Sequence, residues 1–132
     1  MNGEADEWLC YAAENLRTCQ LCLEDGLYNA SLQNAQQATE KALKATALLF
    51  GLPPRKTHSI QDLVRELEIT GVEPMLTDGE CALLDSIYLP SKYPLGSVLP
   101  NYDPNLEIAM QCLSIAEKCV LDARRRRNHG AC

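Results

Sequence analysis

The sequence is poor in aromatic residues: its 132 residues include five tyrosines, one tryptophan and one phenylalanine. A core must therefore be built mainly from leucine, alanine, isoleucine and cysteine, a composition that favours helices. Hydrophobic residues still make up 46% of the chain, which excludes an intrinsically disordered protein. From the length we expect one domain, residues 1–132.

Positive charge is also scarce, and the net charge of −6 argues against nonspecific affinity for nucleic acid or anionic membranes. The N-terminus lacks a basic segment followed by an apolar one, so we expect a cytoplasmic protein. The longest apolar stretch, residues 45–52, is too short to span a bilayer. Four consecutive arginines open a basic tail, residues 124–132, for which we leave disorder or a nucleic-acid contact open.

Chemical motifs are few. The chain has no glycine-rich phosphate loop, no paired catalytic carboxylates and no Gly-x-Ser-x-Gly elbow, so we assign no catalytic residue. Seven cysteines include one Cys-x-x-Cys pair, Cys19 and Cys22, which falls inside a helical pattern and has no second pair at metal-ligand spacing. We interpret the cysteines as reduced, small hydrophobic residues, and we expect neither a metal nor a cofactor.

Apolar periodicity and end signals predict five helical segments. The first spans about residues 4–24 and ends at Asp25-Gly26, and the second extends to Phe50, with Gly51 and two prolines behind it. The third has apolar residues at 60, 63, 64 and 67, a capping-box-like start at Ser59, and an end near residue 71. These patterns are typical of amphipathic helices that pack against one another.

The fourth segment begins with a capping box, Thr77 to Glu80, and ends before Pro90. Residues 90–101 contain three prolines and no helical periodicity, which indicates a loop. The last helix is predicted to begin with Asp103 as its N-cap and Pro104 in its first turn. The predicted fold is all-α, an up-and-down bundle of four to five helices with a long C-terminal helix.

The second helix is the most informative segment. Alanines at 35, 38, 42 and 45 recur three or four residues apart, which makes one face smooth enough for close helix packing. Lys41 and Lys44 lie on the polar part, where Glu40 and Lys44 have the favourable i,i+4 order. The small residues here and in the last helix exceed what a small bundle needs internally, so we expect a homodimer or a complex with a partner. The alternative is that these faces are used inside one chain.

Three fragments together resemble the HEPN (higher eukaryotes and prokaryotes nucleotide-binding) domain family. Residues 36–45 read Gln-Gln-Ala-Thr-Glu-Lys-Ala-Leu-Lys-Ala, residues 58–63 read His-Ser-Ile-Gln-Asp-Leu, and residues 91–94 read Ser-Lys-Tyr-Pro. The last departs from the family's Ser-Arg-Tyr-Pro pattern at Lys92. Order and spacing agree over about residues 5–123, and the resemblance implies the same helical bundle.

The resemblance also implies a function: a nucleotide- or RNA-binding module that works with a separately encoded minimal nucleotidyltransferase, as in toxin–antitoxin systems. Two other functions stay open. One is a metal-independent ribonuclease toxin, and the other is a purely structural dimerisation module.

Five residues of these fragments are the predicted nucleotide- or phosphate-binding site: Lys41, Lys44, His58, Lys92 and Tyr93. His58 precedes a helix whose free N–H groups attract anions, next to Arg55 and Lys56. Converging lysines would suit phosphate, and Tyr93 could stack on a base. The alternatives are a histidine that only orients its loop and lysines that are only solvated surface.

Active ribonucleases of this family carry Arg, four to six residues, then His at the start of the last long helix, where the imidazole exchanges protons with the ribose hydroxyl. The corresponding residues here, 92–106, contain neither Arg nor His. Arg124 and His129 match the spacing formally, but four consecutive arginines produce such a match by chance. The absence at the family position argues against an enzyme.

Overall fold

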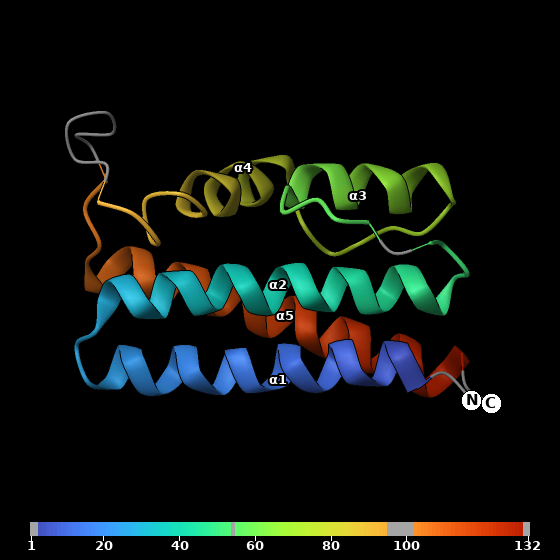
Figure 1. The fold of residues 1–132 in the computed structure, drawn as a ribbon, viewed down its shortest axis with the longest axis horizontal. Coiled ribbons are helices and arrows are strands. Elements are labelled where there is room, and N and C mark those ends of the chain that lie inside the picture. The colour runs from blue at the N-terminus through green and yellow to red at the C-terminus, as the bar shows by residue number, and fades with distance from the viewer. Residues whose placement is uncertain (1–2, 54, 95–101, 131–132) are drawn as a thin grey trace.

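The computed structural model describes residues 3–53, 55–94 and 102–130, and this part of the chain contains five helices and no strand. They are α1 (Gly3–Glu24), α2 (Tyr28–Leu49), α3 (Ile60–Ile69), α4 (Asp78–Ile87) and α5 (Leu106–Gly130). Figure 1 shows α1, α2 and α5 as three long helices lying side by side, with the short α3 and α4 above α2. The predicted all-α bundle with a long C-terminal helix is confirmed.

Helix α2 is the centre of the bundle, since it contacts each of the other four helices. Its alanines at 35, 38, 42 and 45 are at most 1% exposed. Small side chains let α1 and α5 approach this helix closely, and larger ones, led by Leu32, Leu67 and Leu84, fill the remaining core. The smooth alanine face is therefore covered inside one chain, and it does not supply the surface for which we expected a partner.

Local signals set most of the helix ends. After α2, Gly51 adopts φ +78°, a left-handed conformation that favours glycine, and Leu52 donates its backbone N–H back to Ala47. The capping box predicted at α4 is present, because Thr77 accepts from the Glu80 backbone and Glu80 accepts from the Thr77 backbone. These helix ends are determined by contacts between residues that are close in sequence.

The predicted start of the last helix was wrong by two residues. Helix α5 begins at Leu106, and the side chain of Asn105 accepts a hydrogen bond from Ile108 N at 3.0 Å. Asn105 is therefore the N-cap in place of Asp103, and Pro104 precedes the helix. Asparagine and aspartate are about equally good caps, so composition could not choose between them. Part of the predicted loop, residues 95–101, lies outside the described residues.

The arginines of the basic tail lie within α5. Arg126 contacts the Asp122 carboxylate at 2.8 Å and the carbonyl oxygen of Glu73 at 2.6 Å. Arg127 forms two hydrogen bonds to Asp6 of α1, at 2.8 and 3.1 Å, and this contact lowers the pKa of Asp6. These two arginines connect the end of α5 to α1 and to the segment before α4. The side chain of His129 lies outside the part of the chain that the structure describes.

The described cysteines carry free thiols, and four of them are buried: Cys19, Cys81, Cys112 and Cys119. Burial raises the pKa of Cys112 and of Cys119 to about 12, so both remain neutral thiols. Among the described residues, no three His, Cys, Asp or Glu side chains are grouped so as to hold a metal ion. Of the described helices, none has the length and apolar character needed to cross a membrane.

Candidate functional site

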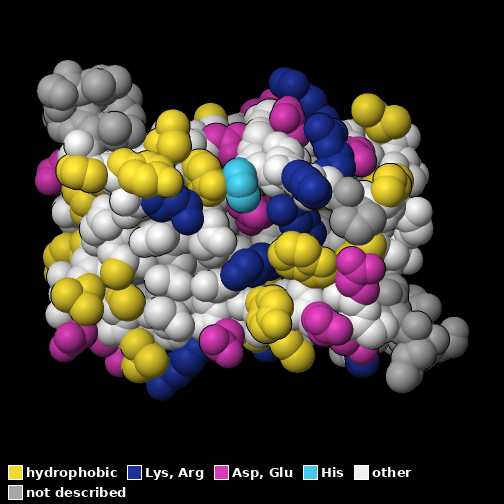
Figure 2. Space-filling model, viewed as in Figure 1, with side chains coloured by type: hydrophobic (Ala, Val, Ile, Leu, Met, Phe, Trp, Pro, Cys, Tyr) yellow, Lys and Arg dark blue, Asp and Glu magenta, His cyan; other side chains and the backbone are white. Residues whose placement is uncertain are grey.

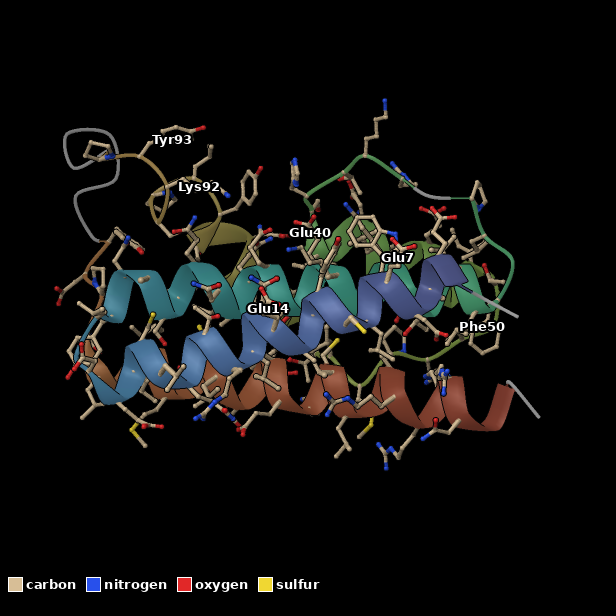
Figure 3. All side chains as sticks on the ribbon, turned by 60° about the horizontal axis from the view of Figure 1, so that its bottom comes forward. Glu7, Glu14, Glu40, Phe50, Lys92 and Tyr93 are labelled. Carbon is tan, nitrogen blue, oxygen red and sulfur yellow. The ribbon has the colours of Figure 1, made fainter. Side chains whose placement is uncertain are left out.

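A buried carboxylate lies at the centre of the candidate site. Glu40 of α2 is 3% exposed, and its oxygens accept hydrogen bonds from Lys44 Nζ at 3.0 Å and from Gln36 Nε2 at 3.2 Å. Because one helical turn separates each of these side chains from Glu40, all three lie on one face of α2. A buried carboxylate is costly unless it is paired, and Lys44 supplies that pair. Figure 3 shows where Glu40 lies on α2.

His58 approaches this carboxylate from the segment before α3. Its Nδ1 lies 3.3 Å from both oxygens of Glu40, and its backbone carbonyl accepts a hydrogen bond from Gln36 Nε2 at 3.4 Å. The imidazole stacks on the ring of Tyr88, with 4.6 Å between centroids and 17° between planes. The His58 side chain is nevertheless 53% exposed. One edge of the ring therefore faces the buried carboxylate, and the other is accessible.

Lys92 and Tyr93 lie on the turn that follows α4. Asn29 of α2 donates a hydrogen bond to the carbonyl oxygen of Ser91 at 2.8 Å, which ties this turn to the bundle. The Lys92 Nζ lies 5.1 Å from the centroid of the Tyr88 ring. Tyr93 is 56% exposed and, in Figure 3, lies on the outer side of this turn, beyond Lys92. The turn thus brings Lys92 to the ring that His58 stacks on, whereas Tyr93 lies beyond this cluster.

Lys41 completes the cluster from the position next to Glu40 on α2. Its Nζ donates a hydrogen bond to Asn15 Oδ1 of α1 at 2.7 Å and lies 5.8 Å from the Tyr11 ring centroid. The pKa of Lys41 is lowered, chiefly by burial. Nearby Lys92 and Lys44 lower it further, and Glu40 and Glu14 act in the opposite direction. Burial and the neighbouring lysines therefore disfavour the charged form of this ammonium group.

Lys41, Lys44 and Lys92 each lie next to an aromatic ring. For Lys44 this ring is Trp8 of α1, whose centroid lies 5.3 Å from Nζ. Beside this pair is a cavity of about 10 Å³ lined by Trp8, Lys44, Pro53, Arg55 and Glu66, among others. Such a volume holds at most one water molecule. This cavity is therefore too small for a nucleotide. On the outer surface of the cluster, Figure 2 shows a histidine side chain among Lys, Arg and acidic side chains.

The structure thus brings together four of the predicted site residues, Lys41, Lys44, His58 and Lys92, and leaves Tyr93 outside. We call these four residues with Glu40 and Tyr88 the lysine cluster. Sequence reasoning missed the last two as site residues. The i,i+4 spacing of Gln36, Glu40 and Lys44 was a visible signal for Glu40, whereas nothing in the sequence linked Tyr88 to His58.

One part of the predicted site was wrong. We expected the N-terminus of α3, next to His58, to attract an anionic ligand, but Asp85 of α4 already occupies it. The Asp85 carboxylate accepts hydrogen bonds from Ile60 N at 2.6 Å and Gln61 N at 3.1 Å, and the Ser59 hydroxyl lies 3.3 Å away. These N–H groups are therefore satisfied within the chain.

Comparisons with known proteins agree with this fold. The family model described as HEPN domain matches residues 5–125. The crystal structure of TT1696 from Thermus thermophilus is similar at a TM-score of 0.78 and 30% identity, covering 96% of this chain and 99% of that one. The structure of ST0689, an archaeal HEPN homologue, shares the fold at a TM-score of 0.67 and 24% identity, covering 91% and 94%.

A search of curated proteins found no match. The family model covers nearly the whole chain, and the order of the sequence fragments, the five helices and the similar structures all agree. The chain belongs to the HEPN domain family.

Proposed function

We propose that the lysine cluster binds the phosphate of a nucleotide or of RNA. The observation that carries this proposal is the juxtaposition of Lys41 and Lys44 of α2 with Lys92 of the turn after α4. Burial is the main cause of the lowered pKa of Lys41, and the two neighbouring lysines lower it further. Like charges gathered on a folded protein cost free energy, and a bound anion would offset that cost. Clusters of this kind are commoner at functional sites than on ordinary surfaces.

The aromatic rings in and beside the lysine cluster support a nucleotide over a simple anion. Tyr11 and Tyr88 lie next to the ammonium groups of Lys41 and Lys92, and Tyr93 is exposed nearby. Bases stack on aromatic rings without needing a particular sequence, and each such contact contributes about 1–3 kcal/mol. Because the whole chain carries a net charge of −6, binding must depend on this local cluster and weaken as salt is added.

We further propose that the protein acts with a partner, either a minimal nucleotidyltransferase or a second copy of itself. The family resemblance motivates the first, in a toxin–antitoxin-like or regulatory system. For the second, the exposed side of α5 offers Leu106, Met110 and Leu121, each between 50% and 55% exposed. Light scattering at micromolar protein tests self-association, and a clean 14.6 kDa species would contradict the second copy.

The binding proposal is tested by titrating ATP, other nucleotides and single-stranded RNA into the wild-type protein and into Lys92→Ala. A charged hydrogen bond to phosphate contributes about 1.5–3 kcal/mol, so the variant should bind about tenfold more weakly or worse. The matched control is Arg65→Ala, which removes an exposed positive charge from α3.

Melting temperatures of the same variants distinguish a residue that binds the ligand from one that only stabilises the fold. Unchanged affinity with lowered stability in Lys92→Ala would mean that residues 91–94 are structural only. Incubating the wild-type protein with single-stranded RNA tests the ribonuclease alternative, because cleavage without added metal would support it.

A further inference from the structure

The pairing of Glu40 with His58 determines how the histidine can meet a ligand. Both carboxylate oxygens lie 3.3 Å from Nδ1, and Glu40 is buried beneath the imidazole. The same carboxylate is held by Lys44 and Gln36. Its position is therefore fixed from inside the bundle and does not depend on a ligand.

An ionised carboxylate has only acceptors, so the nitrogen that faces it must carry the hydrogen. In a neutral imidazole the other nitrogen, Nε2, is then unprotonated and presents a lone pair. Among the described residues, Nε2 of His58 has no hydrogen-bond partner, and the side chain is 53% exposed. The exposed edge of His58 is thus an acceptor, and its protonated form would make the same edge a donor.

Three contacts keep the imidazole from turning away. Tyr88 stacks on the ring, Gln36 binds the backbone carbonyl of His58, and Asp85 holds the next residues at the start of α3. The charged and titratable groups on the elements around the ring are Glu40, Lys41 and Lys44 of α2, Tyr88 just after α4, Lys92 on the following turn, and Arg55 and Lys56 on its own segment. Of these, only Glu40 contacts a ring nitrogen.

We infer that Glu40 is a positioning residue: it holds His58 with the hydrogen on Nδ1, so that Nε2 accepts a hydrogen bond from a hydroxyl of a phosphate-bearing ligand. Lys41 and Lys92 bind the phosphate, and His58 accepts a hydrogen bond from a hydroxyl beside it. The site therefore distinguishes a hydroxyl-bearing nucleotide, such as a ribonucleotide, from one that lacks sugar hydroxyls. The ligand half of this inference rests on the proposed function, whereas the protonation of His58 does not.

The first test needs no ligand. The chain has two histidines, so the change His129→Gln leaves His58 as the only imidazole in a nitrogen-15 correlation spectrum. At mildly alkaline pH, we expect a protonated Nδ1 and an unprotonated Nε2. Predominant protonation at Nε2 in this protein would overturn the inference, regardless of the results obtained with other variants.

The second step changes Glu40→Gln in the same background. The amide can donate as well as accept, so the preference for Nδ1–H should fall toward the mixture of a peptide histidine. Glu7→Gln is the matched control, because Glu7 is exposed on α1 and the same charge is removed there (Figure 3). A purely structural role of Glu40 predicts lower stability with an unchanged preference, and that result would also overturn the inference.

The ligand half is tested with ATP and 2′,3′-dideoxy-ATP, which lacks both ribose hydroxyls. At mildly alkaline pH, the wild-type protein and Glu7→Gln should prefer ATP about fivefold, and Glu40→Gln should lose this preference. Equal affinities in the wild-type protein would overturn the hydroxyl contact while leaving phosphate binding intact. If neither nucleotide binds, the proposed function fails, and the nitrogen spectrum still decides what Glu40 does.

Discussion

Replacing Asp85 by Ala should destabilise the protein more than any exposed acidic substitution on the same helix. Asp85 lies on α4, but its carboxylate caps α3 through Ile60 N at 2.6 Å and Gln61 N at 3.1 Å. Ile60 is fully buried, so its N–H has little access to replacement water. One side chain thus joins two short helices that would otherwise be held mainly by apolar contacts.

The magnitude follows from these contacts. A hydrogen bond to a charged group contributes about 1.5–3 kcal/mol, and two backbone donors lose their partner together. Allowing for water at the half-buried Gln61, we expect the free energy of unfolding to fall by about 2–4 kcal/mol. For a domain of this size, that corresponds to a melting temperature lower by roughly 10 °C. Asp85→Asn keeps one acceptor oxygen and should lose about half as much.

Urea denaturation followed by circular dichroism measures these changes. Asp78→Ala is the control, because Asp78 is an exposed acid in the first turn of the same helix and affects mainly the helix dipole, by about 0.3–1 kcal/mol. If Asp85→Ala destabilises the protein no more than Asp78→Ala does, the carboxylate is not what holds α3 to α4, and our reasoning is refuted.

Three further predictions test the site, the ion pairs and the core. Lys41→Met should weaken ATP binding about tenfold. The melting temperature should fall by no more than a few degrees, because burial already lowers the pKa of Lys41 and so disfavours its charged form. A large loss of stability would show that Lys41 has a structural role. Burial raises the pKa of Glu80, but hydrogen bonds from Lys118 and Thr77 outweigh it and lower the pKa overall. The stabilisation by Glu80 is therefore present at neutral pH and lost as pH falls through the lowered value, so the difference in urea midpoint between wild type and Glu80→Gln should shrink in acid. Cys112→Ser places a more strongly hydrated hydroxyl in the core and should cost about 1–3 kcal/mol by urea denaturation, whereas the exposed Cys10→Ser should cost nothing measurable.

The helices could be predicted because their signals are local. Gly51 with the prolines behind it ended α2, and Thr77 with Glu80 began α4, through contacts within a few residues. The alanine spacing of α2 likewise predicted close packing, and those alanines are buried. Where two good caps stood two residues apart, at Asp103 and Asn105, local chemistry could not decide between them.

The site was predictable only in part, because its decisive contacts join residues far apart in sequence. The Glu40–Lys44 pair was visible as i,i+4 spacing, but its burial depends on how α1 and the segment before α3 cover it. The stacking of His58 on Tyr88 joins residues thirty positions apart, and the Asp85 cap joins α4 to α3. Such pairings follow from the packing of the helices, which no single segment encodes.

The contact between Arg127 and Asp6 joins two residues that lie 121 positions apart in the sequence. In Figure 1, the first turn of α1 and the last of α5 accordingly lie at the same end of the bundle. Domains whose first and last elements end close together tolerate circular permutation. A circular permutant opened at the exposed turn of Asp25 and Gly26, with the end of α5 joined to the start of α1 by a linker, would begin with α2 and end with α1. It would keep every contact of the lysine cluster and place its new ends at the far side of the bundle, where a fusion partner would not crowd Arg127.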